Sequence, residues 1–386
     1  MKKVNIDRLD TVSFLNGLVF YAPVALLVRT DAGVTMAQFF VLQAVLSLTV
    51  FLFEIPTGMI TDKIGYRNTM ILAQVTMFLA RVLLFAAYVG GSYALFVSEA
   101  VVEGFAACFL SGTQDAYIYS VYSDERYAVK AAHVANFGTA GFVASTLLYV
   151  VLYHLGGIRM LIAATMTACG VGICCVAGIG REPAMTKPES DAGRGSSAGV
   201  WAVFKNVHMI LMVLLGAGFS LGFLLINFFY VDKLMACGLR EEWMSPIIIA
   251  YSVVQMSAEK MLDRIEAVHY RTAILVSVIL SGMVMILFAF CRMTVAVVGI
   301  MVLLPLLLSF PAYILESMQN QYIDQCGQAD QRATVLSVAN MAGNLVEIAF
   351  LFASAYSVGI GVLACFAGAG AMLIVLGAAM HMWRKR

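Results

Sequence analysis

Charged residues are scarce in this sequence. Only 12% of its 386 residues are Asp, Glu, Lys or Arg, whereas 61% are hydrophobic and the mean hydropathy is +0.89. Soluble domains carry about 25% charged residues, so a chain this poor in charge would precipitate in water. The scarcity excludes a soluble globular protein and indicates a lipid bilayer as the solvent. The net charge of +1 is scattered over short loops and gives no sign of nucleic acid as a partner.

Several signatures of catalysis and of metal binding are also absent. The sequence has no Gly-x-x-x-x-Gly-Lys-(Ser/Thr) segment to hold ATP and no His-Glu-x-x-His segment to hold zinc. It has no Cys-x-x-Cys pair, and its eight cysteines lie mostly inside apolar runs, as small buried hydrophobic residues do. We therefore expect no enzymatic activity, no cofactor and no metal.

Long apolar runs, in contrast, fill the chain. A membrane-spanning helix needs roughly 20 apolar residues. We predict an all-α membrane protein with twelve such helices, and one long polar stretch, 181–205, reads as a flexible linker. The predicted division is a first six-helix half at 1–180, the linker at 181–205 and a second six-helix half at 206–386. The predicted spans are 11–28, 36–61, 69–89, 92–121, 128–155, 157–180, 206–231, 244–260, 272–291, 293–323, 331–355 and 358–382.

The basic residues are unevenly divided between the two sides of the membrane. If the N-terminus is cytoplasmic, 18 Lys and Arg residues fall on the inner side and 5 on the outer side, with Arg81 inside a span. Inner loops are enriched in Lys and Arg. The asymmetry predicts a multi-pass protein of the cell (inner) membrane with both termini in the cytoplasm.

Short matches indicate that the second half repeats the first. Asp62-Lys-Ile is echoed by Asp263-Arg-Ile, and Asp124-Glu-Arg126 by Asp330-Gln-Arg332. Val134-Ala-Asn136 is echoed by Val338-Ala-Asn340, in the same order along the chain. The second copy of the first element is degraded, because Glu259 and Glu266 stand where glycines would be. Two parallel repeats of six helices are one known transporter architecture.

The turn between the second and third predicted spans carries a recognisable pattern. This segment resembles the loop signature Gly-x-x-x-Asp-(Arg/Lys)-x-Gly-(Arg/Lys)-(Arg/Lys) of the major facilitator superfamily. Its sequence is Glu54-Ile-Pro-Thr-Gly-Met-Ile-Thr-Asp-Lys-Ile-Gly-Tyr-Arg67. Five positions match, and Tyr66 departs from the pattern. The resemblance implies a twelve-helix fold with two pseudo-symmetric halves around a central cavity. It also implies that this turn is a conformational gating element made of Gly58, Asp62, Lys63, Gly65 and Arg67.

The gating turn has a physical rationale of its own. Gly58 lets its span approach another helix closely, and Asp62 can accept backbone N–H bonds at the N-terminus of a neighbouring helix. Lys63 and Arg67 can pair with loop acids such as Asp124. The alternative is that the basic residues of this turn only mark a cytoplasmic loop, as the positive-inside pattern would require.

Carboxylates inside spans are costly and usually face a protein interior or a watery cavity. A buried carboxylate can load and release a proton near neutral pH. We therefore name Glu54, Asp115, Glu316 and Glu347 as candidates for proton or substrate coupling. Packing against the basic loop remains open for Glu54, and a position at the membrane interface remains open for Asp115. Arg81 and Glu103 (or Glu99) are candidates for an intramembrane ion pair, which is either static or functional.

Polar and aromatic residues on the first and seventh spans fit the lining of a cavity, although hydrogen bonds between helices or interface aromatics would explain them as well. They are Asn16, Tyr21, Asn227, Phe228 and Tyr230. Several of the expected cavity residues are aromatic. This slightly favours export of an amphipathic compound or metabolite.

The function expected from these features is secondary active transport of a small organic molecule. We expect a monomer that works by alternating access and is coupled to protons, as an antiporter if it exports. Uptake of a nutrient is the alternative within transport. The alternatives from other classes are a non-transporting membrane sensor and a polytopic membrane enzyme.

Overall fold

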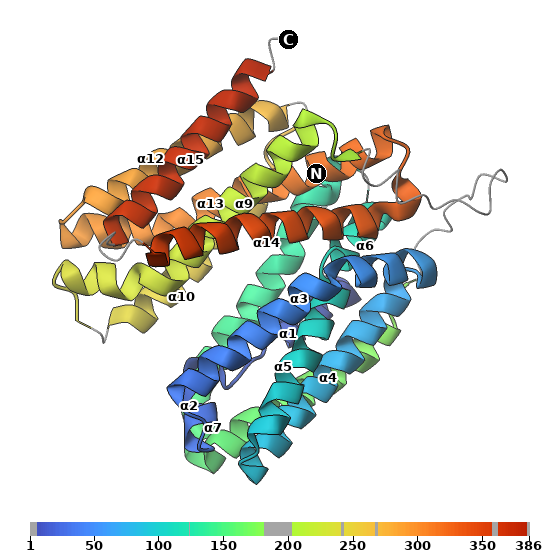
Figure 1. Cartoon of the computed structure of the whole chain (residues 1–386), viewed down its shortest axis with the longest axis vertical. Helices are drawn as coiled ribbons and strands as arrows, with labels where there is room; N and C mark the ends of the chain where they lie inside the picture. The colour runs from blue at the N-terminus through green and yellow to red at the C-terminus, as the bar shows by residue number, and fades with distance from the viewer. Residues whose placement is uncertain are drawn as a thin grey trace. The chain divides into compact units, whose positions relative to one another are not determined.

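The computed structural model describes residues 6–122, 124–180, 203–240, 243–266, 269–356 and 362–383. Every regular element in these ranges is a helix, as Figure 1 shows. The first group comprises α1 (Arg8–Gly17), η1 (Ala22–Val24), α2 (Ala25–Asp31), α3 (Met36–Ile64), α4 (Tyr66–Gly90), α5 (Tyr93–Leu110), α6 (Thr113–Val121) and α7 (Asp124–Ala177). The second group comprises α9 (Val207–Ala236), α10 (Met244–Gln255), α11 (Ser257–Leu262), α12 (Tyr270–Phe290), α13 (Thr294–Gln325), η4 (Ala329–Gln331), α14 (Arg332–Tyr356) and α15 (Val362–Trp383).

Many of these helices are long enough for a bilayer. Within the described residues, nine segments have the length and apolar character to cross a membrane. One of them, Arg126–Ala177, has 52 residues, which at about 1.5 Å per residue is more than twice the roughly 30 Å of a hydrocarbon core. Gly156 and Gly157 interrupt its helical geometry, and the φ of 60° at Gly157 is one that glycine adopts readily. The break coincides with the predicted boundary between the fifth and sixth spans, and the count of twelve stays a prediction.

The described helices form two compact units. The first unit contains α1 to α6, α7 from His133 onward and the short segment Ala329–Val338. The second contains the start of α7 up to Ala132, α9 to α13, α14 from Ala339 onward and α15. Two short segments, at the starts of α7 and α14, group apart from the rest of their helices. The division into halves at 1–180 and 206–386 stays a prediction. Most of the predicted linker, 181–202, lies outside the described residues.

The first predicted span is a broken helix. Between α1 and η1 the backbone leaves the helical conformation, and the Phe20 N–H donates to Thr165 Oγ1 at 3.1 Å instead of to its own helix. Non-helical backbone at membrane depth is tolerated where protein or water satisfies it. Gly17 in α1 lies against Gly138 in α7, so closely that a Cβ on Gly17 would collide with the Gly138 carbonyl.

Pro311 inside α13 is accommodated by a hydrogen bond from a side chain of another helix. Pro311 has no N–H, so the carbonyl of Leu307, four residues earlier, loses its helical donor. The Ser281 hydroxyl from α12 donates to that carbonyl at 2.8 Å. The interior of the second unit therefore supplies the hydrogen bonds that lipid cannot supply.

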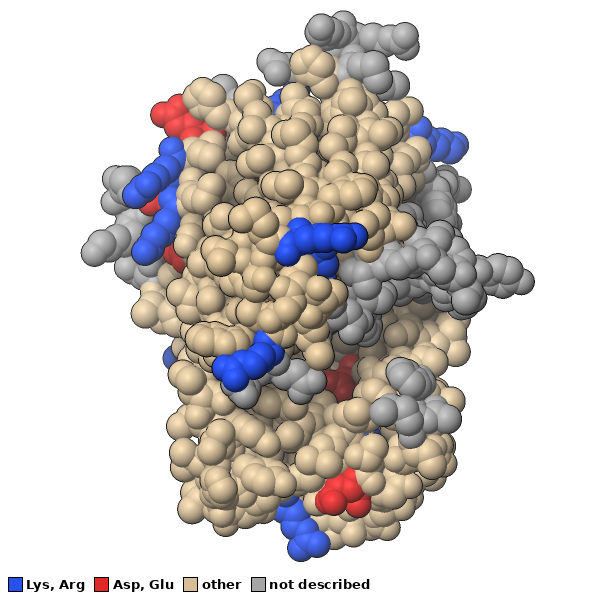
Figure 2. Space-filling model, turned by 90° about the vertical axis from the view of Figure 1, so that its left-hand side faces the viewer, with Lys and Arg blue, Asp and Glu red and all other residues tan. Residues whose placement is uncertain are grey.

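The surface agrees with a lipid environment. Figure 2 shows a face of uncharged residues on which Lys, Arg, Asp and Glu appear as separate patches. Large apolar side chains lie exposed along several helices, among them Leu147, Val150, Val151 and Leu155 of α7. Extended apolar surface of this kind is unusual for a soluble monomer and marks a membrane-facing surface here.

Candidate gating and ion-binding sites

The turn that carries the predicted gating residues joins α3 to α4. Gly65 ends α3 and immediately precedes Tyr66, the first residue of α4. Its φ of 89° lies in the region that glycine occupies without strain. This allows the chain to reverse within one residue, which places the last turn of α3 at the end of the bundle. Asp62 and Lys63 lie in that last turn.

Asp62 caps another helix, α14, whose N-terminus belongs to the same compact unit. Its Oδ1 accepts the Ala333 N–H at 3.0 Å, and its Oδ2 accepts the Thr334 N–H at 2.9 Å. The Thr334 hydroxyl also donates to Oδ2, at 2.5 Å. The first N–H groups of a helix have no acceptor within the helix, and the helix dipole favours a negative charge there. Asp62 therefore makes the backbone contact that the sequence led us to expect, 271 residues away in the chain.

Two glycines let α14 come this close. A Cβ on Gly58 would lie 2.7 Å from Ser337 Oγ and 3.0 Å from the Ala333 carbonyl oxygen. Gly112, between α5 and α6, has a φ of 65°, and a Cβ there would lie 3.4 Å from Leu336 Cβ. Larger residues would push the start of α14 away.

An arginine at the start of α14 completes the contact. Arg332 is 4% exposed, and its guanidinium carbon lies 4.1 Å from the centre of the Tyr119 ring of α6. Stacking of a cation on an aromatic face is worth about 0.5–2 kcal/mol, more where water is excluded. We refer to Gly58, Asp62, Gly112 and Tyr119 as the α14 seat.

The two basic residues of the turn have different environments. Lys63 is exposed. Arg67 donates from Nε to the Ile179 carbonyl at 2.8 Å and from Nη2 to the Ala177 carbonyl at 2.5 Å, at the end of α7. Arg8 donates to the Gly178 carbonyl beside it. These cations satisfy carbonyls that the end of a helix leaves open. The side chain of Asp124, the acid expected to pair with this turn, lies outside the described residues.

The candidate coupling carboxylates lie in different surroundings. Glu54 is 1% exposed, and its Oε1 accepts the Ser111 hydroxyl at 2.6 Å. Asp115 is half-buried in the first turn of α6, where the helix dipole favours a carboxylate. Glu316 is half-buried on α13, and the Tyr127 hydroxyl lies 3.5 Å from its Oε2. The side chain of Glu347 lies outside the described residues.

The predicted intramembrane pair belongs to a larger group of charges. Arg81 Nη2 of α4 lies 2.9 Å from Glu103 Oε1 of α5, which is the ion pair expected from the sequence. One turn earlier on α5, Glu99 Oε1 lies 3.2 Å from Arg29 Nη2 of α2. The ring of Tyr21 lies between the two cations, 5.5 Å from the Arg81 guanidinium carbon and 5.9 Å from that of Arg29. We refer to these five residues as the charged cluster.

The remaining cavity candidates are only partly described. Asn16 of α1 has a buried Oδ1 without a hydrogen-bond partner among the described residues. Tyr230 of α9 is half-buried. The side chains of Asn227 and Phe228 lie outside the described residues. In the described ranges, no group of three or more His, Cys, Asp or Glu side chains is placed to hold a metal ion.

Outside the membrane-length segments, Tyr122 makes one further polar contact. Its hydroxyl donates to Asp7 Oδ2 at 2.6 Å. Burial and this bond to a carboxylate together raise the pKa of Tyr122 above its ordinary value. The contact links the end of α6 to the cap of α1.

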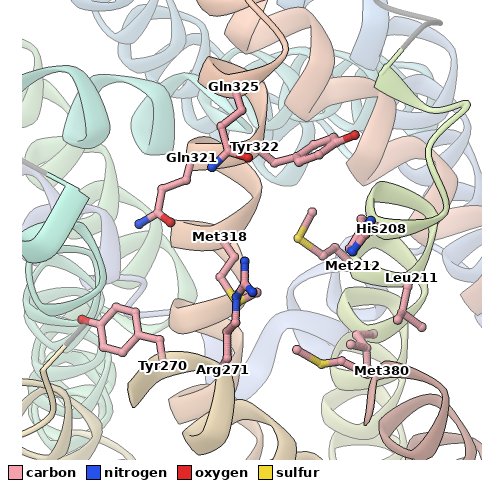
Figure 3. A pocket seen from close by; sticks show the side chains of 11 residues that line it. His208, Leu211, Met212, Tyr270, Arg271, Met318, Gln321, Tyr322, Gln325 and Met380 are labelled. Atoms are coloured by element: carbon pink, nitrogen blue, oxygen red, sulfur yellow. The ribbon is translucent and has the colours of Figure 1, made fainter. Parts of the chain in front are cut away.

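A pocket in the second unit was not expected from the sequence. Figure 3 shows side chains from four helices around a cavity of about 150 Å³. Its lining combines Arg271 and His208 with methionines, two glutamines and two tyrosines. Sites for drug-sized ligands usually measure about 300–1,000 Å³. This pocket is therefore too small to hold most organic solutes whole.

A comparison with protein families identifies the chain. Residues 9–351 match the Major Facilitator Superfamily. The chain belongs to the major facilitator superfamily. It is therefore a membrane transporter and not an enzyme.

Solved structures of other superfamily proteins share its fold. The E. coli fucose:proton symporter FucP superposes with a TM-score of 0.77 at 13% identity, over 97% of each chain. A FucP structure in the outward conformation gives 0.76 at 14% identity, over 97% of each chain. The human organic anion transporter MFSD10 (TETRAN) gives 0.72 at 13% identity, again over 97% of each chain. A comparison with curated proteins found no match.

Sequence reasoning missed two residues of the α14 seat, Gly112 and Tyr119, and the α14 residues that the seat contacts. The superfamily pattern named Gly58 and Asp62 but not the residues they meet, which include Ala333, Thr334 and Ser337. The echo of Asp124-Glu-Arg126 by Asp330-Gln-Arg332 was a usable signal, because it marked the start of α14 as an equivalent of the start of α7. Arg29 was counted among the outer loop cations, although it is only 6% exposed.

Proposed function

We propose that this protein is a proton-coupled secondary transporter of a small organic solute, and that the α14 seat is the lock of its alternating-access cycle. The observation that carries the proposal is the capping of α14 by Asp62. A lock must hold firmly in one state and release in another. A carboxylate on a helix N-terminus has this property, because its energy is concentrated in a few short hydrogen bonds.

The size of this contact suits a reversible switch. Loss of a helix cap costs about 0.5–2 kcal/mol, and hydrogen bonds to charged groups contribute about 1.5–3 kcal/mol. A conformational equilibrium shifts about tenfold for every 1.4 kcal/mol. The seat is therefore strong enough to bias the protein toward one state and weak enough for a bound solute to reverse that bias.

The place of α14 in the two units supports the same role. Its first residues group with the first unit, and the helix from Ala339 onward groups with the second. Release of the first turn from Asp62 would therefore free a helix that continues into another body. By the positive-inside pattern this lock lies on the cytoplasmic side, with both termini in the cytoplasm and the protein in the inner membrane.

Proton coupling is supported by the buried carboxylates and by a structural neighbour that is named a proton symporter. Glu54 and Glu316 remain candidates, because each is at least half-buried and lies near a hydroxyl group that can hydrogen-bond either protonation state. Asp115 at the start of α6 is a weaker candidate, because its helix end favours the charged form.

A flux assay in proteoliposomes tests the proposal. Vesicles that hold a pH indicator are challenged in turn with neutral sugars, polyols and small monocarboxylates. We expect at least one class to trigger proton movement, and Asp62→Asn to reduce it strongly. The matched control is Asp31→Asn, which removes an exposed carboxylate of the same unit that accepts the Tyr88 hydroxyl at 2.6 Å.

Two outcomes would count against parts of this account. If labelled solute crosses the membrane without proton movement, proton coupling is rejected and the transport function stands. Full flux in Asp62→Asn would show that the seat is not the lock.

A further inference from the structure

The pocket in the second unit lies at one end of a ring of four helices. In this ring α9 packs against α13, α13 against α12, α12 against α15, and α15 against α9. The lining residues come from the starts of α9 and α12 and from the ends of α13 and α15. The positive-inside pattern predicts that this end of the helices faces the cytoplasm.

The polar side chains of the pocket offer positive charge and hydrogen-bond donors. Among the eleven described residues that line it there is no Asp or Glu. Figure 3 shows Arg271 extending from α12 into the middle of this group, with His208 of α9 on the opposite side. Within the described part of the chain, Arg271 forms neither an ion pair nor a hydrogen bond. The pocket therefore presents a guanidinium group that is available to an anion.

The first unit contains an equivalent group of donors. Its helix α4 begins with Tyr66-Arg67, just as α12 begins with Tyr270-Arg271. The two tyrosines are buried to the same degree, at 2% and 3% exposed. The sequence Tyr117-Ile118 of α6 is repeated as Tyr322-Ile323 in α13, and Tyr322 lines the pocket. The two units thus place the same residue types at the same ends of corresponding helices.

In the first unit these donors hold oxygen atoms of the chain. Arg67 donates to the carbonyls of Ala177 and Ile179. The Tyr117 hydroxyl donates to the Gly180 carbonyl at 3.1 Å. In the second unit the corresponding side chains surround a cavity of about 150 Å³ instead. The repeat therefore indicates that the occupant of this cavity supplies oxygen acceptors.

The other side of the pocket is apolar. Met212 and Leu215 of α9 are buried, and Met318 of α13 and Met380 of α15 are half-buried beside them. A ligand that fits both sides combines an anionic oxygen group with apolar atoms. A phosphate suits the planar fork of an arginine, and basic pockets between helices on the cytoplasmic side of a membrane are typical sites for anionic lipid headgroups.

We propose that this pocket binds the phosphate headgroup of an anionic phospholipid from the cytoplasmic leaflet, with Arg271 as its main contact. The cavity is large enough for the headgroup, and the acyl chains stay outside it in the bilayer. Soluble phosphate offers the same oxygen atoms but leaves the methionine side of the pocket unused. The proposal is independent of the transported solute and of proton coupling.

Lipid-dependent thermal stability of the purified full-length protein tests the proposal. Phosphatidylglycerol is titrated into the protein in a neutral detergent, and the shift in Tm gives an apparent affinity. Phosphatidylcholine is the control without net charge, and inorganic phosphate is the soluble source of the same group. The variants are Arg271→Gln and Arg271→Lys. The matched charge control is Arg264→Gln, whose parent side chain is exposed in the same unit and does not line the pocket.

The expected results separate a binding role from a structural one. Phosphatidylglycerol raises the Tm of the wild-type protein, whereas phosphatidylcholine and inorganic phosphate do not. Arg271→Gln weakens the apparent affinity for phosphatidylglycerol roughly fivefold to tenfold, and Arg264→Gln leaves it unchanged. Arg271→Lys gives an intermediate affinity, because it keeps the charge and loses the fork. A purely structural Arg271 would lower the Tm in detergent alone and leave the lipid dependence unchanged.

Contrary results would overturn the proposal even if a variant folds poorly. Equal stabilisation of the wild-type protein by phosphatidylglycerol and phosphatidylcholine would reject an anion site. An equal loss of affinity in Arg264→Gln would assign the effect to the general surface charge. If inorganic phosphate stabilises the protein as strongly as phosphatidylglycerol, and does so through Arg271, the lipid is rejected as the source of the phosphate.

Discussion

The turn at Asp62 and its echo at Asp263 have different structures in this molecule. In the first copy α3 runs unbroken to Ile64, and Asp62 near its end caps α14. In the second copy the helix breaks at Met256, and the short α11 ends at Leu262. Asp263, the residue that follows, has an exposed side chain. The Asp-(Lys/Arg)-Ile sequence is present in both. The Asp-(Lys/Arg)-Ile sequence alone therefore does not produce a helix-capping contact.

The glycines explain much of this difference. Gly58 permits a helix to lie against it, whereas Glu259 occupies the equivalent place in α11 with a long side chain. Gly65 allows the reversal into α4, whereas Glu266 stands at its equivalent. α11 is anchored instead by two buried apolar residues, Ala258 and Leu262. The close approach of the backbones, more than the charge of the aspartate, distinguishes the first copy, the proposed lock, from the second.

The largest expected effect follows from filling the space at Gly58. Gly58→Leu would collide with Ser337 and Ala333, and overpacking typically costs about 1–3 kcal/mol. We expect hydrogen exchange of the Ala333 and Thr334 amides to accelerate roughly tenfold to hundredfold, measured by mass spectrometry in detergent. Glu259→Leu is the matched change in the second copy and leaves these amides unchanged. Equally slow exchange in both variants would contradict the role of Gly58.

The next effect comes from the carboxylate itself. Asp62→Asn keeps one acceptor and loses the charge, at a cost of about 0.5–2 kcal/mol. The same two amides then exchange roughly 2-fold to 30-fold faster. In Asp263→Asn they exchange at the wild-type rate. A comparable acceleration in the two variants would mean that the first turn is not a local lock.

A smaller effect is expected at Arg332. Arg332→Lys keeps the charge and loses the planar group stacked on Tyr119, so we expect a loss of about 0.5–1 kcal/mol. Exchange at Ala333 and Thr334 increases roughly 2-fold to 5-fold, and Tyr119→Leu has the same effect without any change at Arg332. Arg126→Lys, at the echoed position, serves as the control. If Tyr119→Leu has no effect, the ring does not hold Arg332.

The smallest effect is expected from changing the second copy of the turn. The double change Glu259→Gly and Glu266→Gly restores both glycines of the pattern in the second copy. We expect no change at the α14 amides and a slightly lower Tm, because a glycine inside a helix costs about 1 kcal/mol. A rise in Tm would show that the glycines alone are enough to build a second lock.

Sequence reasoning recovered the helices and the first turn well, because both depend on local properties. Apolar length fixes a spanning helix, and Gly65 fixes a reversal wherever the rest of the chain lies. Even the use of Asp62 as a helix cap could be anticipated, since a carboxylate near a helix end suits the dipole of another helix.

The features that sequence reasoning missed all depend on contacts between residues far apart in the chain. Nothing in the sequence around Arg29 distinguishes a loop cation from one buried against Glu99, because the distinction depends on where α2 and α5 meet. The break between Gly17 and Ala22 was missed for the same reason, since its Phe20 N–H is satisfied by Thr165, 145 residues away. The partner of Asp62 could not be identified either, because no local spacing relates α3 to α14.

The capping of α14 also has a consequence for biosynthesis. Asp62 leaves the ribosome 271 residues before the amide it will bind, which at about 5–20 residues per second is a delay of roughly 15–50 s. The N-terminus of α14 is thus capped by an aspartate that was synthesised well before it.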